Sequence, residues 1–255
     1  MAALNHPPGT FCWFECGSTD ASKSKPFYEH LFGWQADDMP MPEGGGSYTI
    51  LKSAGESVAG LYQLSGPQYE GVPSHWMTYV SVENIDETTR RAAELGAKIL
   101  AEPMEVPEVG RISALRDPTG AVISLAHFDK HPGTSKNGPF GWSELATRDT
   151  AQAGQFYTKL LGWGLKEDPE HRYTEFQVSG RSVGGMMAMS PQQADVPPHW
   201  LPYVMVGDAD SIARKVRELG GKVYVEPTDI PDVGRFCVFA DPAGAVLAVI
   251  QMRGR

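Results

Sequence analysis

The second half of this 255-residue chain repeats the first half. Residues 139–163 repeat the pattern of residues 9–34 at a shift of 129 residues. Further along, at a shift of 124, the pair His75-Trp76 recurs at His199, and the turn sequence that begins at Asp117 recurs at Asp241. A repeat of about half the chain indicates two globular copies, because the repeats of solenoid proteins are roughly 20 to 50 residues long. The duplication therefore predicts two similar domains.

Each copy is about 120 residues long, which is enough to bury a hydrophobic core without disulfides or metal staples. The formal charge of −9 (22 basic minus 31 acidic residues) argues against nucleic acid or an anionic membrane as the main partner. The three cysteines, Cys12, Cys16 and Cys237, have no cysteine at the matching positions of the other copy. Reduced thiols, the absence of a long apolar run and the absence of a signal sequence together predict a soluble cytoplasmic protein.

Each copy divides again into two modules with the order strand, helix and three strands. The predicted first domain spans residues 9–128, with modules at about 9–66 and 73–128. A polar linker rich in turn-forming residues covers residues 129–138. The predicted second domain spans residues 139–252, with modules at about 139–190 and 197–252.

The first module predicts a strand at residues 11–17 and a helix at residues 21–32, capped by Asp20 and ended by Gly33. Because Pro26 lies inside this helix and removes a backbone donor, we expect the helix to begin nearer Lys25. Further strands follow at 48–52 and 57–64, with matches at 173–178 and 182–189, and the glycines Gly44 to Gly46 suggest a mobile hairpin tip. The second module predicts a strand at 75–82, a helix at 85–95, a strand at 97–101 and a hairpin at 111–128.

Several short motifs recur in the same order in both copies, and they cover nearly the whole chain. In the first copy they are Asp20 with Phe27-Tyr28 and Leu31 to Trp34, then Glu94 to Ala97, Val109 to Arg111 and Asp117 to Ala121. In this order they resemble the vicinal oxygen chelate superfamily, also called the glyoxalase, bleomycin-resistance and extradiol dioxygenase superfamily, in its tandem two-domain bacterial form. The resemblance implies an α+β fold in which each domain curls an eight-stranded mixed sheet around a cleft. It does not fix the activity, because the superfamily contains lyases, isomerases, dioxygenases, thiol transferases and drug-binding proteins.

Enzymes of this superfamily bind a divalent metal ion through imidazole and carboxylate ligands on the central strands. Counting from the motifs places these ligand positions at six residues of this chain: Phe14, Met77, Ser124, Ser143, Leu201 and Ala248. None of these side chains suits a hard or borderline cation. We therefore expect no cofactor and no metal ion. A shift of one residue would bring Glu15 and Glu144 into the first-strand position, so a non-standard divalent metal site remains an alternative.

The same resemblance implies a cleft face with apolar walls and few polar groups. The expected ligand-binding residues are Phe14, Met77, Tyr79 and Ser124 in the first copy and Ser143, Leu201 and Tyr203 in the second, with Cys12, Cys16, Leu145 and Ala248 on the same faces. Arg111 and Arg235 either clamp a carboxylate or phenolate at the cleft edge or form ion pairs with their acidic neighbours, Glu105 and Glu108 or Asp229 and Asp232.

The catalytic candidates are His75, His199, Glu15 and Glu144. Each histidine either exchanges a proton at the cleft mouth or tethers the proline-rich loop before it. Each glutamate either acts as a base or ligand or is a structural carboxylate.

Two functions of different class follow. The first is a protein that binds a small apolar or aromatic molecule without a metal ion. The second is a lyase, dioxygenase or hydroxylase that acts on an aromatic or polyketide-like metabolite. An interaction protein that keeps only the fold is a third, and the expected assembly is a monomeric pseudo-dimer or a homodimer.

Overall fold

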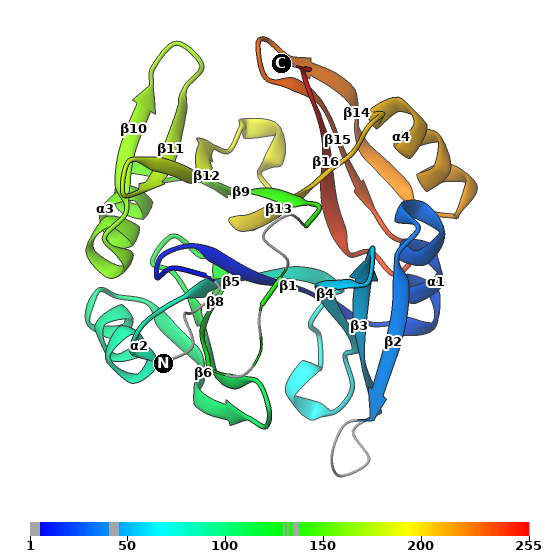
Figure 1. Cartoon of the computed structure of the whole chain (residues 1–255). Helices are drawn as coiled ribbons and strands as arrows, with labels where there is room; N and C mark the ends of the chain where they lie inside the picture. The colour runs from blue at the N-terminus through cyan, green and yellow to red at the C-terminus, as the bar shows by residue number, and fades with distance from the viewer. Residues whose placement is uncertain (1–5, 41–45, 130, 132, 135–137, 255) are drawn as a thin grey trace. The chain divides into compact units, whose positions relative to one another are not determined.

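A computed structural model describes residues 6–40, 46–129, 131, 133–134 and 138–254 (Figure 1). In the first copy the elements are β1 (Phe11–Ser18), α1 (Ala21–Phe32), β2 (Gln35–Pro40), β3 (Ser47–Ser53), β4 (Glu56–Gln63), β5 (His75–Ser81), α2 (Ile85–Glu94), β6 (Lys98–Val106), β7 (Gly110–Arg116) and β8 (Val122–Phe128). In the second copy they are β9 (Phe140–Thr147), α3 (Thr150–Leu161), β10 (Gly164–Asp168), β11 (Tyr173–Val178), β12 (Arg181–Ala188), β13 (His199–Met205), α4 (Ala209–Glu218), β14 (Lys222–Ile230), β15 (Gly234–Ala240) and β16 (Val246–Met252). Short 3₁₀ turns, η2 (Pro67–Tyr69) and η3 (Pro191–Gln193), precede β5 and β13.

Each copy forms one eight-stranded mixed sheet, as the sequence predicts. The strand order is β2-β3-β4-β1-β5-β8-β7-β6 in the first copy and β10-β11-β12-β9-β13-β16-β15-β14 in the second. The pairs β1·β4 and β5·β8 are parallel, and the hairpins that flank them are antiparallel. The two sheets have the same order because each module repeats the same strand sequence.

Most element bounds agree with prediction, but α1 does not begin near Lys25. It begins at Ala21 and holds Pro26 in its interior. The first turn is fixed by other bonds: the backbone N–H of Ala21 donates to Gln63 Oε1 at 2.9 Å, and the hydroxyls of Ser18 and Ser24 lie 2.7 Å apart. These tertiary contacts stabilise the turn that precedes the proline, so the helix does not need to start later.

The edge strands β2 and β10 were not located from the sequence. All of β2 except Ala36 is exposed, and β10 is exposed except at Asp168. Neither strand therefore shows the apolar alternation that marks a half-buried strand. The predicted tip at Gly44 and Gly45 and much of the predicted linker lie outside the described residues. None of the described helices is long and apolar enough to cross a bilayer.

The chain forms two compact units, and each unit combines one module from each copy. Unit 1 contains Met1–Trp13, Met77–Gly133 and Trp142–Leu201, and unit 2 contains Phe14–Trp76, Thr134–Gly141 and Pro202–Arg255. In unit 1, helix α2 of the first copy packs on helix α3 of the second, and in unit 2, α1 packs on α4 (Figure 1). The predicted domain limits follow the sequence repeat and stay a prediction.

The core of unit 1 is built from both copies. Val80, Leu115 and Leu125 of the first copy share one buried cluster with Tyr157 and Trp163 of the second. The Trp163 ring contacts the rings of several other aromatic residues and donates a 2.8 Å hydrogen bond to the carbonyl of Gly9. Each copy therefore contributes about half of the apolar contacts that exclude water from this core.

A buried chain of polar groups crosses the same core. Trp200 Nε1 donates to the Tyr157 hydroxyl at 2.8 Å, and that hydroxyl donates to Asp117 Oδ2 at 2.8 Å. Asp117 Oδ1 accepts the backbone N–H groups of Thr119, Gly120 and Ala121. This arrangement explains why the His-Trp pair, the Phe-Tyr pair and the Asp-Pro-x-Gly turn recur together.

Unit 2 repeats this chain with fewer bonds to the turn aspartate. Trp76 Nε1 donates to the Tyr28 hydroxyl at 2.8 Å, and Asp241 Oδ1 accepts the N–H groups of Ala243 and Ala245. Among the described residues, Asp241 Oδ2 finds no hydrogen-bond partner although it is buried. The two units thus share the same arrangement of buried polar groups but differ in how many of these groups are hydrogen-bonded.

Alkaline solution is expected to destabilise the fold. Burial raises the pKa of the Tyr28 and Tyr157 phenols and of the Cys12 and Cys16 thiols. These groups stay neutral in the folded state, whereas in the unfolded chain thiols ionise near a pKa of 9.0 and phenols near a pKa of 10.0. Their stabilising contribution is therefore complete below pH 9 and is lost as the pH rises. Each group lowers the free energy of unfolding by about 1.4 kcal/mol per pH unit above its unfolded pKa.

Denaturant titrations between pH 7.5 and pH 11 measure this loss. Tyr157→Phe removes one titrating phenol and is expected to flatten the slope above pH 10, whereas the same change at the exposed Tyr224 leaves the slope as it is. A free energy of unfolding that stayed constant up to pH 11 would contradict the burial of these groups.

Candidate functional site

The two faces of β1 carry different chemistry. On one face, the Phe14 ring stacks on Phe140 at a centroid distance of 4.1 Å, and Ser18 contacts Ser24 of helix α1. On the opposite face, Glu15 accepts a hydrogen bond from the Tyr48 hydroxyl. Successive side chains of a strand alternate between its faces, so Cys16 lies with Phe14 in the core. Whether Phe14 and Cys16 line a cleft or touch a ligand stays a prediction.

Strand β9 of the second copy has the same arrangement of faces as β1. Ser143 is buried, with its hydroxyl 3.3 Å from the Thr78 hydroxyl, and Leu145 belongs to the core of unit 1. Glu144 lies on the opposite face and accepts a hydrogen bond from Tyr173. Both glutamates therefore lie on the face opposite to Phe14 and Ser143, and contact of Phe14 and Ser143 with a ligand stays a prediction.

The other expected ligand-binding positions lie on the central strands β5, β8, β13 and β16. Tyr79 pairs with Ser124, and Tyr203 pairs with Ala248, in parallel register. These four residues and Leu201 are buried, whereas Met77 is half-buried. Whether any of them touches a ligand stays a prediction.

Five half-buried side chains of unit 2 form a polar and aromatic group that we call the Glu15 face. Its members are Glu15, Tyr48, Tyr62, Tyr69 and His75. The Tyr48 hydroxyl donates to Glu15 Oε1 at 2.6 Å. It reaches the carboxylate by crossing over Gly60, which is the partner of Glu15 in the sheet. A side chain at Gly60 would place its Cβ 1.9 Å from the Tyr48 hydroxyl, so only glycine admits this bond.

Tyr62 stands at the centre of the Glu15 face. Its ring lies 6.4 Å from the Tyr48 ring, at an interplanar angle of 18°, and 6.0 Å from the Tyr69 ring of the turn η2. Burial raises the pKa of the Tyr62 phenol, and the nearby charge of Glu15 raises it further. The phenol therefore stays protonated at neutral pH and can donate a hydrogen bond. Its hydroxyl lies over Gly17, beside the His75 ring.

Both candidate histidines hold the loops that precede them. His75 Nδ1 lies 2.8 Å from the carbonyl of Pro73, and His199 Nδ1 lies 2.9 Å from that of Pro197. Because a carbonyl only accepts, Nδ1 carries the proton, and Nε2 of a neutral ring is then an acceptor. The structure thus contains the hydrogen bonds by which His75 and His199 tether the preceding loops. Proton exchange at Nε2 stays a prediction.

The second copy carries a related but less polar face in unit 1. Trp142 Nε1 donates to the Tyr173 hydroxyl at 2.9 Å, which in turn donates to Glu144 Oε2 at 2.8 Å. Tyr173 crosses over Gly185 as Tyr48 crosses over Gly60. At the sheet positions that correspond to Tyr62 and Gly17, this copy has Met187 and Ala146. The glutamate–tyrosine pair is thus common to both copies, and the surrounding tyrosines belong to the first copy.

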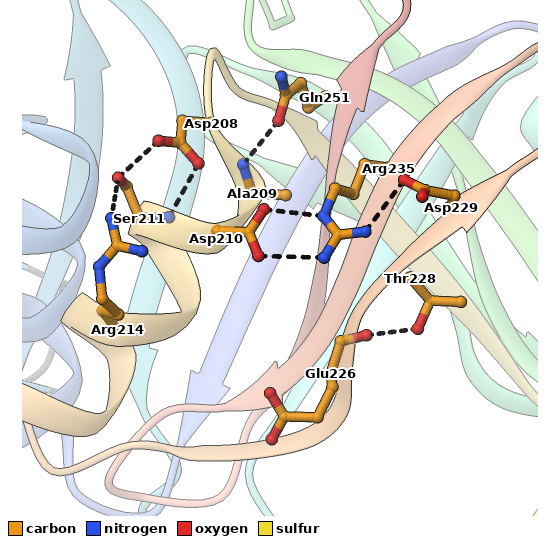
Figure 2. Close-up of polar contacts among 10 residues, drawn as sticks. All are labelled: Asp208, Ala209, Asp210, Ser211, Arg214, Glu226, Thr228, Asp229, Arg235 and Gln251. Atoms are coloured by element: carbon orange, nitrogen blue, oxygen red, sulfur yellow. Dashed lines mark hydrogen bonds and ion pairs between the residues drawn. The ribbon is translucent and has the colours of Figure 1, made fainter.

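Arg111 and Arg235 each form a paired contact with a helix aspartate, and Arg235 also bonds Asp229, one of the neighbours that the sequence suggested. Figure 2 shows Arg235 with Nε 2.7 Å and Nη2 3.1 Å from the two oxygens of Asp210, and with Nη1 3.0 Å from Asp229. Arg111 forms the same paired contact with Asp86, while Glu105 lies 3.9 Å away. The guanidinium lowers the pKa of the Asp86 carboxyl. These arrangements match the ion-pair alternative and tie strands β7 and β15 to the first turns of α2 and α4.

The donors of the Glu15 face do not fit the metal centre of the superfamily's enzymes. Such a centre needs several imidazole or carboxylate ligands. In the described part of the chain no three His, Cys, Asp or Glu side chains come together in a group that could hold a metal ion. Beside Glu15, strand β4 offers Gly60, and the space above this glycine is filled by Tyr48. We therefore derive no chemistry through a metal ion.

Comparisons with known proteins match the whole duplicated chain. The model of the family "Glyoxalase/Bleomycin resistance protein/Dioxygenase superfamily" matches residues 13–125 and again residues 140–249. The chain is 36% identical over 249 residues to the "Putative glyoxylase CFP32" of Mycobacterium bovis, with 95% of each chain covered. It is 33% identical over 262 residues to the anthracycline biosynthesis protein DauV of a Streptomyces species, with 96% of this chain and 94% of the relative covered.

Solved structures with the same fold include a dioxygenase and a glyoxalase. The 2,3-dioxygenase LapB of Pseudomonas sp. KL28 aligns with a TM-score of 0.66 at 13% identity, over 96% of this chain and 93% of its own. The Mn(II)-bound glyoxalase of Novosphingobium aromaticivorans aligns with a TM-score of 0.66 at 15% identity, over 96% and 82%. At such identities the likeness shows the fold alone.

Proposed function

Because the chain belongs to the Glyoxalase/Bleomycin resistance protein/Dioxygenase superfamily, we propose that it binds a small aromatic organic molecule at the Glu15 face and does so without a metal ion. The observation that carries this proposal is a row of three half-buried tyrosine rings, of which the first, Tyr48, bonds the Glu15 carboxylate. Aromatic rings contribute large contact areas, and a few placed polar groups orient a ligand. The relative named for anthracycline biosynthesis supports an aromatic ligand.

The metal-free part of the proposal is supported by the donor set. Glu15 is occupied by the Tyr48 hydroxyl, and the strand beside it supplies a glycine instead of a ligand. Elemental analysis of protein purified without added metal is the test. We expect iron, zinc, nickel and manganese well below one equivalent per chain and no change in ligand binding after treatment with a chelator. A stoichiometric metal ion would overturn the metal-free part of the proposal. It would not contradict the binding of an aromatic molecule.

A second candidate function is an enzyme that transfers a proton on an aromatic or polyketide-like metabolite. Glu15 is placed for this role by the 2.6 Å bond to Tyr48, and His75 offers a second titratable group on the same face. The names of the glyoxylase and anthracycline relatives support it. Incubation of the protein with a bound aromatic metabolite, followed by mass spectrometry, distinguishes turnover from binding alone.

The matched glycines Gly60 and Gly185 give a direct test of the binding face. Gly60→Ala places a methyl group where the Tyr48 hydroxyl lies and so displaces Tyr48 from Glu15. We expect calorimetry with a neutral naphthalene probe, 1-naphthalenemethanol, to show at least about tenfold weaker binding, the cost of one lost buried contact of roughly 1.4 kcal/mol. Gly185→Ala makes the equivalent change in the second copy and is expected to alter affinity less than about twofold.

Tyr48→Phe serves as a milder variant, because it keeps the ring and removes only the hydroxyl that bonds Glu15. Circular dichroism and thermal unfolding establish that each variant is folded before binding is compared. If Gly60→Ala and Gly185→Ala weaken probe binding equally, or if neither weakens it, the Glu15 face is not the binding site.

A further inference from the structure

We propose that residues 65–71 form a lid segment that opens to admit a ligand to the Glu15 face, and that Tyr69 then packs on the bound aromatic ring. This inference rests on the proposed function and adds to it a ligand-binding residue and a route by which the ligand enters. The lid segment follows β4 and contains the turn η2. The corresponding residues of the second copy, 189–195, are not expected to move in this way.

Tyr69 joins the lid segment to the Glu15 face. It is half-buried, whereas every other residue from 65 to 71 is exposed. Its ring lies 6.0 Å from the Tyr62 ring, at an interplanar angle of 55°. One half-buried ring pair stabilises a segment much less than the packing of several core residues does, so the lid segment can leave the face while the rest of unit 2 stays folded.

The backbone of the lid segment is bonded to itself. The N–H of Tyr69 donates to the carbonyl of Gly66 at 3.1 Å, and the N–H of Val72 donates to the carbonyl of Tyr69 at 3.0 Å. Gly66 and Gly71 flank this turn with φ values of 99° and 76°, which glycine adopts without steric cost. The segment can therefore move as one body about the two glycines, because its internal bonds stay intact.

Both ends of the lid segment are fixed. Before it, the N–H of Leu64 donates to the carbonyl of Ser18 at 2.7 Å. After it, the hydroxyl of Ser74 accepts the N–H of Thr19 at 2.9 Å. The motion is thus confined to the residues between these two bonds, and a segment that has opened brings Tyr69 back to the same place when it closes.

The second copy provides an internal comparison, because its corresponding segment is built differently. At a shift of 124 residues, three positions of the lid segment are changed: Gly66 to Ser190, Tyr69 to Gln193 and Gly71 to Asp195. The side chain of Gln193 turns back and accepts the N–H of Ser190 at 2.9 Å. Neither flexible glycine nor inward tyrosine is therefore present at these positions.

An arginine also holds the segment of the second copy in place. Arg148 Nη2 donates to the carbonyls of Gln193, Ala194 and Val196 at 3.2, 2.7 and 2.8 Å. At a shift of 129, the first copy has Thr19 at the position of Arg148. The copy that carries the row of tyrosines is thus the copy whose segment has glycine hinges and no arginine at this position.

The spacing of the rings determines how a ligand enters. Stacked rings lie about 3.5–4 Å apart, so a planar ligand between Tyr62 and Tyr69 needs about 7 Å between the two ring centres. The present 6.0 Å, with the rings tilted by 55°, does not admit a third ring. The lid segment must therefore move outward first, and we expect its opening to limit the rate of association.

Stopped-flow fluorescence of the full chain with 1-naphthalenemethanol measures the rates of association and dissociation. Tyr69→Gln installs the residue of the second copy and removes the ring that packs on the ligand. We expect dissociation to become at least about fivefold faster, because one aromatic contact is lost. Tyr69→Phe keeps the ring and should stay within about twofold of the wild type. Circular dichroism establishes that each variant is folded.

Thr19→Arg transfers to the first copy the arginine that holds the segment of the second. The two turns share a backbone bond, from Val72 to Tyr69 and from Val196 to Gln193, so the new guanidinium meets equivalent carbonyls. We expect association and dissociation both to become at least about fivefold slower, because opening breaks the added charge-assisted bonds. Arg148→Thr is the matched control and should leave both rates within about twofold of the wild type.

Hydrogen exchange measures the motion without a ligand. After correction for intrinsic rates, the amides of Tyr69 and Val72 should exchange at least about tenfold faster than the matching amides of Gln193 and Val196. Thr19→Arg should slow exchange at the first pair, and Arg148→Thr should speed it at the second. If the two pairs exchange equally in the wild type, the lid segment does not open and the inference is wrong.

The binding outcomes separate the lid from the proposed function. If Tyr69→Gln and Thr19→Arg leave the probe rates unchanged while Gly60→Ala still weakens binding, the lid inference is wrong and the Glu15 face remains the binding site. If Arg148→Thr changes the rates instead, the ligand lies in the second copy and both assignments to the Glu15 face fail. If no probe binds to the wild type, the proposed function fails, and the ligand-binding role of Tyr69 fails with it.

Discussion

When the chain is divided within residues 129–138 and each copy is produced alone, neither copy is expected to fold as a stable monomer. The core of unit 1 joins Val80 and Leu125 of the first copy to Tyr157 and Trp163 of the second, and unit 2 is likewise built from both copies. A separated copy would expose about half of each core to water. With roughly 25 cal/mol lost for each Å² of apolar surface that stays exposed, about 600 Å² is enough to offset the usual stability of 5–15 kcal/mol.

Size-exclusion chromatography with light scattering and denaturant titration of each half measure this outcome. A single half should be unfolded, aggregated or paired with a second copy of itself, and mixing the two halves should restore the cooperative unfolding of the intact chain. The control is the intact chain with a protease site inserted in the same segment, which should stay folded after cleavage. A monomeric half that unfolds cooperatively on its own would contradict the shared cores.

Replacement of the turn aspartate of unit 1, Asp117→Ala, is expected to destabilise the protein by about 3–5 kcal/mol. This carboxylate accepts the N–H groups of its own turn through Oδ1 and the Tyr157 hydroxyl through Oδ2. Its removal leaves buried donors without acceptors, and each such donor costs about 1–3 kcal/mol. Chemical denaturation at pH 7 gives the free energy of unfolding.

Asp241→Ala is the matched control for this substitution. Asp241 bonds the N–H groups of Ala243 and Ala245 through one oxygen, while its buried Oδ2 has no hydrogen-bond partner among the described residues. Asp117 also accepts from the Tyr157 hydroxyl, the Gly120 N–H and the Thr119 hydroxyl, which have no counterparts at Asp241. We therefore expect Asp241→Ala to cost at least about 1 kcal/mol less than Asp117→Ala. A double-mutant cycle of Asp117→Ala with Tyr157→Phe should give a coupling energy above about 1 kcal/mol. A coupling energy near zero would show that the bond to Tyr157 contributes nothing measurable, and equal costs at the two aspartates would show the same for all the additional bonds of Asp117.

The order of the elements could be predicted because it depends on local signals. Gly33 ends α1 in a left-handed conformation, and the Asn84 side chain caps α2 by accepting the N–H of Glu87 at 3.0 Å. Such signals act within a few residues and repeat in both copies. The predicted start of α1 near Lys25 was wrong because the backbone N–H of Ala21 donates to the side chain of Gln63, which lies 42 residues later in the sequence. The local sequence around α1 does not indicate that bond.

The candidate site was harder to predict because it depends on which face of β1 is buried. Trp13 and Phe14 are both large and apolar and both buried, so the alternation of residue types does not distinguish the faces. The bond from Tyr48 to Glu15 also requires the register of three strands, with Tyr48 beside Tyr62 and Glu15 beside Gly60. The signal that sequence reasoning missed is that Tyr48, Gly60 and Glu15 all have counterparts, Tyr173, Gly185 and Glu144, in the second copy.

The differences between the Glu15 face and its counterpart at Glu144 bear on how a duplicated protein acquires new specificity. In a symmetric dimer of identical chains, any substitution appears in both sites at once. A substitution that improves one site is therefore also present in the other site, even where it is harmful there. Once the two copies are fused in one chain, Tyr62 and Met187 can evolve separately while the shared cores keep the fold intact. A library that varies Met187 and Ala146 on the otherwise unchanged chain therefore offers a route to a ligand specificity that differs from the one proposed for the Glu15 face.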